Sequence, residues 1–309
     1  MSEGTKIMTC RIDKDKIIIH FGAGFLNKVL TDLERYAEMW NLSNFEQIDY
    51  YSVNCIFKCV SHKHGLSILK IGSDFKEAEN EYNILQEYGG TRFCRVYEAD
   101  ISKGVLLTEC IVPGTQLRAE SNLDKRLDLF YELSSKLHIK PASKEIYPTY
   151  IGWVSRITKY MGERKDYEVL YNKMSYAERI CRSLCGKYPG EMLLHGDLHH
   201  DNILLGENNS YRIIDPKGVI GDAVFDIPRF ILNEFDDVLD EDFRKKYIHI
   251  TQTLSGKFNI PEYDIRRLTY VEMCMAHCWN VENGQKPSID EVLFTENLMN
   301  EMGDAYDGN

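Results

Sequence analysis

The sequence predicts an α+β fold in two lobes, a small N-terminal lobe with an antiparallel sheet and a mainly helical C-terminal lobe. The chain has 309 residues, 43% of them hydrophobic, which is enough for two separate cores. Segments with strand character are concentrated before residue 111, whereas helical periodicity dominates from residue 123 onward. Pro113-Gly114 breaks the pattern between them, so we assign residues 1–110 and 111–309 to the two lobes.

The N-terminal lobe is expected to combine two amphipathic helices with five strands. Apolar residues recur at helical spacing over residues 24–40 and again over 75–88, where Gly89-Gly90 ends the pattern. Strand-like runs occupy residues 48–53, 55–60 and 66–71, and His-Lys-His-Gly at 62–65 predicts a hairpin turn between the last two. Two further strands are expected at 93–98 and 104–110.

The charge of the chain narrows the class of partner. The net charge is -11, and an acidic surface repels phosphate backbones, so we expect no nucleic-acid partner. A neutral or cationic small molecule fits this charge better. No apolar run is long enough to span a bilayer, and the first residues lack the layout of a signal peptide, so we expect no membrane partner and a cytoplasmic location.

The motif with the most chemical information is His-Gly-Asp-Leu-His-His-Asp-Asn at residues 195–202. It lies between two short apolar runs, and a second apolar run follows that ends at Asp215. A His-x-Asp-x-x-x-x-Asn loop followed by a hairpin ending in Asp is the layout of protein-kinase-like phosphotransferases. The two predicted lobes therefore suggest a bilobal protein-kinase-like fold, with nucleotide bound by the N-terminal lobe and catalysis and substrate binding in the C-terminal lobe.

Phosphoryl transfer needs few groups from a protein, and this motif offers them. A carboxylate must receive the proton of the acceptor hydroxyl, and Asp197 is the candidate base. Mg²⁺ prefers hard oxygen ligands, which Asn202 and Asp215 can supply as an amide oxygen and a carboxylate. His195 is expected to be structural and to hold the loop backbone.

The nucleotide, ATP or GTP, should be bound by the N-terminal lobe. Lys70 ends a strongly apolar strand and can hold the phosphates. Its expected partner is Glu81 on the next helix, with Glu77 one turn earlier as the alternative. Around these, the loop near Ser52 and Asn54 is expected to cover the phosphates although it contains no glycine, and backbone groups near Glu109 and Ile111 are expected to contact the purine.

Two other classes of protein remain open at this point. His195, Asp197, His199 and His200 could form a transition-metal cluster of a hydrolase, because imidazole and carboxylate groups bind Zn²⁺ or Fe²⁺. This interpretation leaves Lys70 and the small lobe without a use. A non-catalytic nucleotide-binding protein would keep the fold without turnover, and the glycine-free loop is its only support.

Several segments together resemble the aminoglycoside phosphotransferase family, in particular its streptomycin 6-kinase and hydroxyurea phosphotransferase branch. The segments are Leu-Leu-His-Gly-Asp-Leu-His-His-Asp-Asn-Ile-Leu, Ile-Asp-Pro-Lys-Gly, Gly-Asp-Ala-Val-Phe-Asp and Leu-Leu-Thr-Glu-Cys-Ile-Val-Pro-Gly, at residues 193–204, 214–218, 221–226 and 106–114. The resemblance implies a kinase-like fold, ATP or GTP with Mg²⁺, and a hydroxyl acceptor on a small molecule. It further implies that Asp197 is the base, that Asn202 and Asp215 hold metal, and that Asp226 supports the loop.

The sequence narrows the chemical identity of the acceptor only in part. Residues 233–243 are strongly acidic and would attract a polycationic aminoglycoside near the cleft, but an exposed acidic helix face is the favoured explanation for them. Trp279 lies on a late helical segment that could form one wall of an acceptor pocket or belong to the core. Another small alcohol or a sugar remains an alternative acceptor, and Lys217 has no assigned role.

Overall fold

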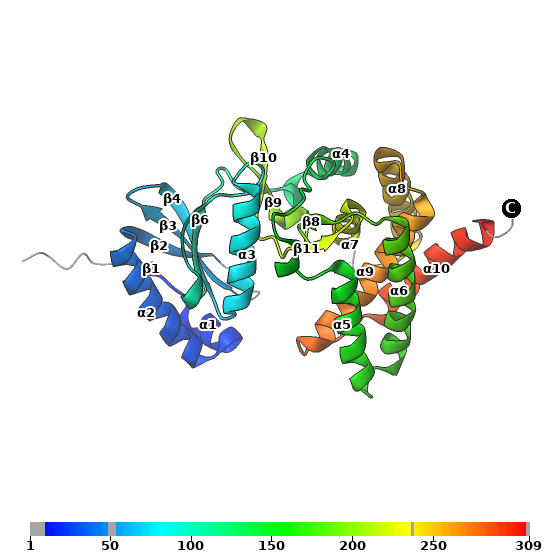
Figure 1. Ribbon diagram of the computed structural model, residues 1–309, viewed down its shortest axis with the longest axis horizontal. Helices are drawn as coiled ribbons and strands as arrows, with labels where there is room; N and C mark the ends of the chain where they lie inside the picture. Colours follow the sequence, from blue (N-terminus) through cyan, green and yellow to red (C-terminus); the bar gives the residue numbers. More distant parts are fainter. Residues whose placement is uncertain (1–9, 49–53, 236–237, 307–309) are drawn as a thin grey trace, which may run out of the picture. The chain divides into compact units, whose positions relative to one another are not determined.

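The computed structural model describes residues 10–48, 54–235 and 238–306, and it divides into two compact units (Figure 1). One unit, here called the sheet unit, contains the chain up to Thr115 together with Leu204–Asp215. The other, the helical unit, contains Gln116–Ile203 and the chain from Pro216 onward. The first segment thus runs to Thr115 rather than to residue 110, and residues 204–215 belong to the sheet unit although they lie far along the chain.

The sheet unit is built on a six-stranded sheet with the order β1-β2-β3-β4-β6-β5. Its strands are β1 (Cys10–Arg11), β2 (Leu42–Ile48), β3 (Asn54–Ser61), β4 (Gly65–Gly72), β5 (Val96–Asp100) and β6 (Val105–Glu109). Neighbouring strands are antiparallel except for β1, which pairs parallel to β2. The predicted antiparallel sheet and the hairpin turn between β3 and β4 are therefore present.

Some predicted boundaries in this unit were displaced. The strand β2 ends at Ile48, the first residue of the strand expected at 48–53, and the rest of that expected strand lies outside the described part of the chain. The strand expected at 93–98 begins at Val96, because Phe93 pairs instead with Ile213 in an isolated bridge. The helix α1 (Lys14–Phe21) and the two-residue strand β1 were not anticipated.

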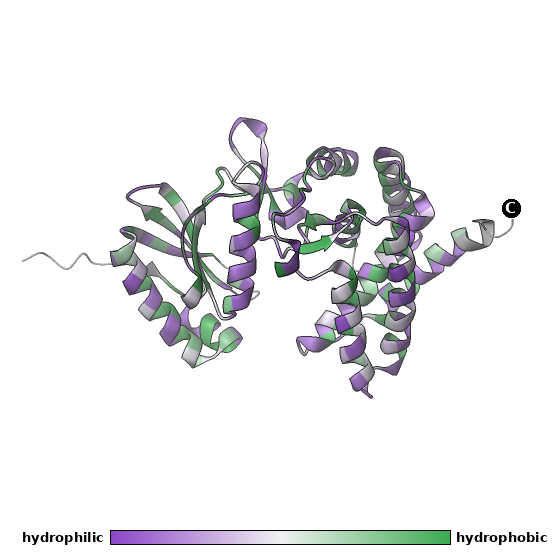
Figure 2. Ribbon diagram, in the orientation of Figure 1, coloured by the Kyte–Doolittle hydropathy of each residue, from purple (hydrophilic) through white to green (hydrophobic). Residues whose placement is uncertain are grey.

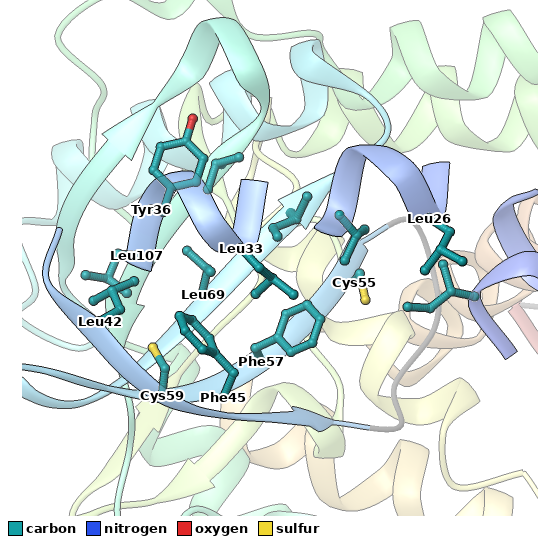
Figure 3. Close-up of a cluster of buried hydrophobic side chains, with 14 residues drawn as sticks. Leu26, Leu33, Tyr36, Leu42, Phe45, Cys55, Phe57, Cys59, Leu69 and Leu107 are labelled. Atoms are coloured by element: carbon teal, nitrogen blue, oxygen red, sulfur yellow. The ribbon is translucent and has the colours of Figure 1, made fainter. Parts of the chain in front are cut away.

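The helix α2 (Ala23–Met39) supplies one side of the core of the sheet unit (Figure 3). Its buried residues Leu26, Leu33 and Tyr36 pack with strand residues such as Phe45 and Phe57, all at most 8% exposed. Figure 2 shows hydrophobic and hydrophilic residues mixed along α2, as expected for a helix that buries one face. The apolar spacing in the sequence therefore predicted both the helix and its buried side.

The helix α3 (Phe75–Tyr88) is fixed at both ends by local chemistry. The Asp74 side chain accepts hydrogen bonds from the backbone N–H groups of Lys76 and Glu77, which caps the first turn. At the other end, Gly89 has a φ of 56°, a left-handed conformation that glycine adopts without steric cost. The helix bounds match the predicted range and set the face on which Glu81 is buried.

Helices make up most of the helical unit. They are α4 (Leu123–Ser134), α5 (Tyr150–Glu163), α6 (Glu168–Lys187), α7 (Ile227–Leu232), α8 (Glu241–Phe258), α9 (Glu262–Glu282) and α10 (Ile289–Tyr306). The 21-residue α9 is buried along most of its length and packs against α5, α6, α7, α8 and α10. In the described ranges, no helix combines the length and the apolar composition needed to cross a membrane.

Short strands position the motif segments of the chain. In the helical unit, β8 (Met192–Leu194) pairs antiparallel with β11 (Val219–Gly221). A separate sheet has the order β10-β9-β7, formed by Thr115–Gln116 (β7), Ile203–Leu205 (β9) and Tyr211–Ile213 (β10). The loop of residues 195–202 therefore begins at the end of β8 and finishes in a short 3-10 helix, η4 (His200–Asn202).

Candidate active site

The backbone of the 195–202 loop is held from inside by His195, which is fully buried. Its carbonyl accepts hydrogen bonds from the N–H groups of Lys217 and Gly218, at 2.8 and 3.1 Å. Its ring atom Nδ1 accepts the N–H of Asp197 at 3.0 Å. His195 therefore joins the start of the loop to the segment that follows Asp215 in sequence, and its ring fixes the backbone of Asp197.

A second buried group, Asp226, fixes the same turn from the other side. Its two carboxylate oxygens accept the N–H groups of His195 and Gly196, each at 2.8 Å, and His138 Nε2 lies 2.8 Å from Oδ2. Burial acts to raise the pKa of Asp226, but His138, His195 and the Gly196 N–H outweigh it, and the pKa lies below its ordinary value. The carboxylate therefore stays ionised inside the unit.

The turn at Gly196 has room only for glycine. Its φ is 81°, and a Cβ atom there would lie 2.8 Å from the ring of Trp153. Trp153 packs edge-on against Trp279, with ring centroids 5.9 Å apart, and both rings are partly exposed. Trp279 thus belongs to an aromatic pair that lies beside the turn.

Asp197 projects from this fixed backbone toward Arg229 and His199. Its Oδ1 lies 3.2 Å from Nε of Arg229, and its Oδ2 lies 3.7 Å from Nε2 of His199. Burial acts to raise the pKa of Asp197, but Arg229, His199 and Lys217 outweigh it and hold the pKa far below its ordinary value. Asp197 is therefore a carboxylate at neutral pH, able to accept a hydrogen bond from a hydroxyl group.

Asn202 is buried at the end of the same loop. Its Nδ2 donates to the carbonyl of Asp197 at 2.9 Å and lies 3.2 Å from His199 Nε2. Since the amide nitrogen is used in this way, the amide oxygen is the atom that Asn202 can offer to a metal ion.

The remaining polar residues of the loop are anchors. His200 is buried, stacks on Phe230 with centroids 4.0 Å apart, and places Nε2 2.7 Å from Glu234. Asp201 accepts two hydrogen bonds from Arg118, at 2.7 and 2.8 Å. Both side chains therefore fasten the loop to neighbouring segments of the helical unit.

This arrangement contradicts the hydrolase interpretation. The ring of His195 is bonded to its own loop, and that of His200 is turned toward Glu234. Across the described ranges, no three His, Cys, Asp or Glu side chains are grouped so that they could hold a metal ion. The cluster of His195, Asp197, His199 and His200 therefore does not form, because two of its imidazoles are committed to holding the loop in shape.

Sequence reasoning missed two buried charges of this region, Arg229 and Glu234. Both lie in the mainly apolar segment Ile-Pro-Arg-Phe-Ile-Leu-Asn-Glu, at residues 227–234. A charged residue within such a segment needs a buried partner, and that signal was available. Glu234 also changes the interpretation of the acidic segment 233–243. Its carboxylate, the first in the segment, points inward to Arg126 and His200.

The sheet unit presents a second constellation around Lys70, on β4. Its Nζ lies 2.5 Å from Glu81 Oε1 and 2.9 Å from Asp215 Oδ1. Burial acts to lower the pKa of Lys70, but the two carboxylates outweigh it, so the pKa is raised and the ammonium stays charged. Glu81 rather than Glu77 is thus the partner of Lys70, and Asp215 joins the pair from a distant part of the sequence.

Asp215 has an unusual backbone conformation. Its φ is 58°, in the left-handed region that few residues other than glycine adopt. Such a conformation costs free energy and persists where surrounding contacts fix it, often at functional sites. It places the Asp215 carboxylate on Lys70.

The other predicted nucleotide-contact residues lie at strand ends of the sheet unit or just beyond them. Asn54 is the buried first residue of β3, and Ser52 is outside the described residues. Glu109 ends β6, where its N–H bonds to the Arg95 carbonyl at 2.8 Å. Ile111 follows it and is 9% exposed.

Glu234 should give the protein a measurable acid sensitivity. Burial acts to raise the pKa of Glu234, but hydrogen bonds from His200 and Arg126 outweigh it and lower the pKa from 4.5 to about 2. A depressed pKa in the folded state stabilises the protein above the unfolded pKa, and the effect is lost as pH falls from about 5 to about 2. We expect the ionised Glu234 to contribute roughly 3 kcal/mol to the free energy of unfolding near neutral pH, and we expect this contribution to disappear in acid. It is measured as the free energy of unfolding of the parent protein minus that of Glu234→Gln, over a range of pH.

The control for this measurement is Glu241→Gln, which changes a carboxylate that is 66% exposed at the start of α8. It should leave the pH dependence of unfolding as it is in the parent protein. A Glu234→Gln protein with an unchanged pH profile would contradict the assignment of Glu234 as an ionised anchor.

Solved structures with a similar fold include kinases of small molecules. A choline kinase from Streptococcus pneumoniae matches with a TM-score of 0.63 and 14% identity, over 90% of this chain and 99% of that one. An aminoglycoside phosphotransferase in a complex with ADP and hygromycin B matches with a TM-score of 0.62 and 11% identity, over 87% and 96%. These likenesses establish a protein-kinase-like fold.

Sequence relatives are more specific. A streptomycin 6-kinase of Streptomyces glaucescens is 22% identical over 240 residues, 74% of this chain and 75% of that protein. A hydroxyurea phosphotransferase of Kitasatospora aureofaciens is 45% identical over 116 residues, 37% of this chain and 32% of that protein. The model of the aminoglycoside/hydroxyurea antibiotic resistance kinases matches residues 40–284. The chain therefore belongs to the aminoglycoside/hydroxyurea antibiotic resistance kinase family, and it is a phosphotransferase that acts on hydroxyl groups.

Proposed function

We propose that this phosphotransferase moves the γ-phosphoryl group of ATP or GTP to a hydroxyl group of an aminoglycoside, in the manner of a streptomycin kinase. The observation that carries the proposal is the state of Asp197, a carboxylate held ionised on a backbone fixed by His195 and Asp226. Such a group can orient an acceptor hydroxyl and take its proton. The streptomycin 6-kinases among the relatives support this choice of acceptor.

The proposed reaction is an in-line displacement. The acceptor oxygen forms a bond to the γ-phosphorus, the bond from that phosphorus to the bridging oxygen breaks, and the nucleoside diphosphate leaves with the electron pair. Asp197 aligns the acceptor hydroxyl and receives its proton as the new bond forms. Lys70, held by Glu81 and Asp215, supplies the cation for the nucleotide phosphates.

A divalent cation fits the donor set of the chain. Asn202 and Asp215 would hold Mg²⁺ through an amide oxygen and a carboxylate, the hard donors that this ion prefers. When bound, Mg²⁺ neutralises charge on the phosphates. Asn54, Ser52 and the backbone near Glu109 and Ile111 remain proposed nucleotide contacts.

The net charge favours a cationic acceptor. At -11, the chain attracts polycations such as aminoglycosides and gains association rate from this attraction. Hydroxyurea is the second candidate, because the hydroxyurea phosphotransferase relative reaches 45% identity over its 116 matched residues.

A panel of acceptors tests the proposed substrate. Nucleotide consumption is measured with Mg²⁺ and either ATP or GTP, in the presence of streptomycin, other aminoglycosides, hydroxyurea, choline or simple sugars. We expect stimulation by streptomycin above the basal rate, because its cationic groups suit the acidic chain. Stimulation by hydroxyurea alone would replace the aminoglycoside with the second candidate, and stimulation only by choline or a sugar would contradict both.

Replacing Asp197 should remove turnover and leave nucleotide binding. Asp197→Asn keeps the shape of the side chain but removes the group that receives the proton, so kcat should fall about 10²- to 10⁴-fold. Nucleotide affinity, measured by calorimetry, should change little. The matched control is Asp242→Asn, which alters a carboxylate that is 90% exposed at the start of α8 and should leave kcat unchanged. Equal kcat in Asp197→Asn and the parent protein would contradict the role of Asp197.

The position of Lys70 should depend on Glu81 and not on Glu77. Glu81→Gln removes the charge that holds the ammonium, and we expect nucleotide affinity to fall about 10- to 100-fold, since a hydrogen bond to a charged group contributes about 1.5–3 kcal/mol. Glu77→Gln, one turn earlier on α3, is the matched control and should bind nucleotide as the parent protein does. A larger loss of nucleotide affinity in Glu77→Gln than in Glu81→Gln would show that nucleotide binding does not depend on the pairing of Lys70 with Glu81.

A further inference from the structure

We propose that Arg229 is a positioning residue for phosphoryl transfer, which aims the Asp197 carboxylate by bridging it to Glu272, a carboxylate buried on α9. This inference rests on the proposed function, in which Asp197 orients the acceptor hydroxyl. All three residues and the tyrosine behind them lie within the helical unit.

The contacts form a chain of four side chains from four elements. Arg229, on α7, places Nε 3.2 Å from Asp197 Oδ1 and Nη2 2.7 Å from Glu272 Oε1. Tyr150, at the start of α5, donates its hydroxyl to Glu272 Oε2 at 2.6 Å. The guanidinium is therefore fixed by a carboxylate that is itself fixed, and Asp197 is the only member of this chain that lies on the 195–202 loop.

Arginine suits this place better than lysine for a geometric reason. Nη2 of Arg229 pairs with Glu272 at 2.7 Å, and Nε, which has no hydrogen-bond partner among the described residues, meets Asp197 through charge at 3.2 Å, so the planar guanidinium reaches both carboxylates at once. The guanidinium also lies over the ring of Trp279, at 5.4 Å from the centroid, and its side chain is only 16% exposed. An aromatic cover keeps water from the cation and strengthens its pairing with Asp197.

The two carboxylates lie in different surroundings. The side chain of Asp197 is 25% exposed and lies on the 195–202 loop. The side chain of Glu272 is 3% exposed and is held by both Arg229 and Tyr150. Glu272 is therefore the fixed end of the chain of contacts, and Asp197 is the end that can meet an acceptor.

The other groups near Arg229 do not replace it. Asp226 lies close enough to act on its charge, but its oxygens are bonded to the loop backbone and to His138. On the Asp197 side, His199 is 3.7 Å away and Lys217 acts through its charge. Loss of Arg229 should therefore leave Asp197 free to rotate and easier to protonate, while Lys70 in the sheet unit keeps its own partners.

The first test needs no substrate. In protein labelled with ¹³C at aspartate carboxyl groups, the Asp197 signal is assigned by its loss in Asp197→Asn and observed at neutral pH. We expect its position to change in Arg229→Gln, because the cation 3.2 Å from Oδ1 is lost and the carboxylate can turn away. Arg229→Lys should keep the signal closer to its position in the parent protein, because the charge remains.

The matched control is Arg266→Gln, which removes another buried arginine of the helical unit, one paired with Glu262 on its own helix. It should leave the Asp197 carboxyl signal at its position in the parent protein. An Asp197 signal at the same position in Arg229→Gln and in the parent protein would overturn the proposal.

The second test uses the acceptor that stimulates turnover. In Arg229→Gln we expect kcat to fall about 100-fold, the effect of a small misplacement of a catalytic group, with the KM for nucleotide unchanged. Arg229→Lys should recover part of this loss. Should Arg229→Gln fail to fold, Arg229→Lys decides, because a kcat equal to that of the parent would show that bridging is not needed. Absence of turnover in the parent protein with every acceptor would refute the proposed function, and the position of the Asp197 carboxyl signal would still decide whether Arg229 positions Asp197.

Discussion

One buried carboxylate determines the shape of the 195–202 loop. The two oxygens of Asp226 accept hydrogen bonds from the N–H groups of His195 and Gly196. The turn that results requires a positive φ at Gly196. The direction of the Asp197 side chain follows from that turn, since its own N–H is bonded to the His195 ring. Truncating the Asp226 side chain would remove the acceptors of these two N–H groups, and the loss of an acceptor costs about 1–3 kcal/mol for a buried N–H group.

Each unit pairs one buried cation with two carboxylates. In the sheet unit, Lys70 lies between Glu81 and Asp215. In the helical unit, Arg229 lies between Asp197 and Glu272. A buried charge is stable only when it is paired, so each of these cations is held in place before any substrate binds. Such preorganisation is what phosphoryl transfer requires, because the protein contributes mainly positioning and charge.

The sequence predicted the pairing of Lys70 with Glu81 from a strand end and a helix face, and the structure contains this pair. Asp197, Asn202 and Asp215 were singled out from the loop and the strand that follows it, as proposed catalytic and metal-binding residues. Arg229 and Glu272 were not, because their pairing joins α7 to α9 across 43 residues of sequence and depends on how the helices pack. The hydrolase cluster failed for the same reason, since burial of His200 against Phe230 and Glu234 is a tertiary contact.

The central claim is that the phosphoryl group passes from the nucleotide to a hydroxyl oxygen of a small molecule. It is tested most directly by ³¹P NMR of a mixture of the protein, ATP or GTP, Mg²⁺ and streptomycin. The account predicts that the γ-phosphate signal is replaced by the signal of a phosphate monoester. The phosphate should stay covalently attached to the acceptor after the nucleotide is removed. Inorganic phosphate as the sole product, with streptomycin and with every other acceptor, would contradict it.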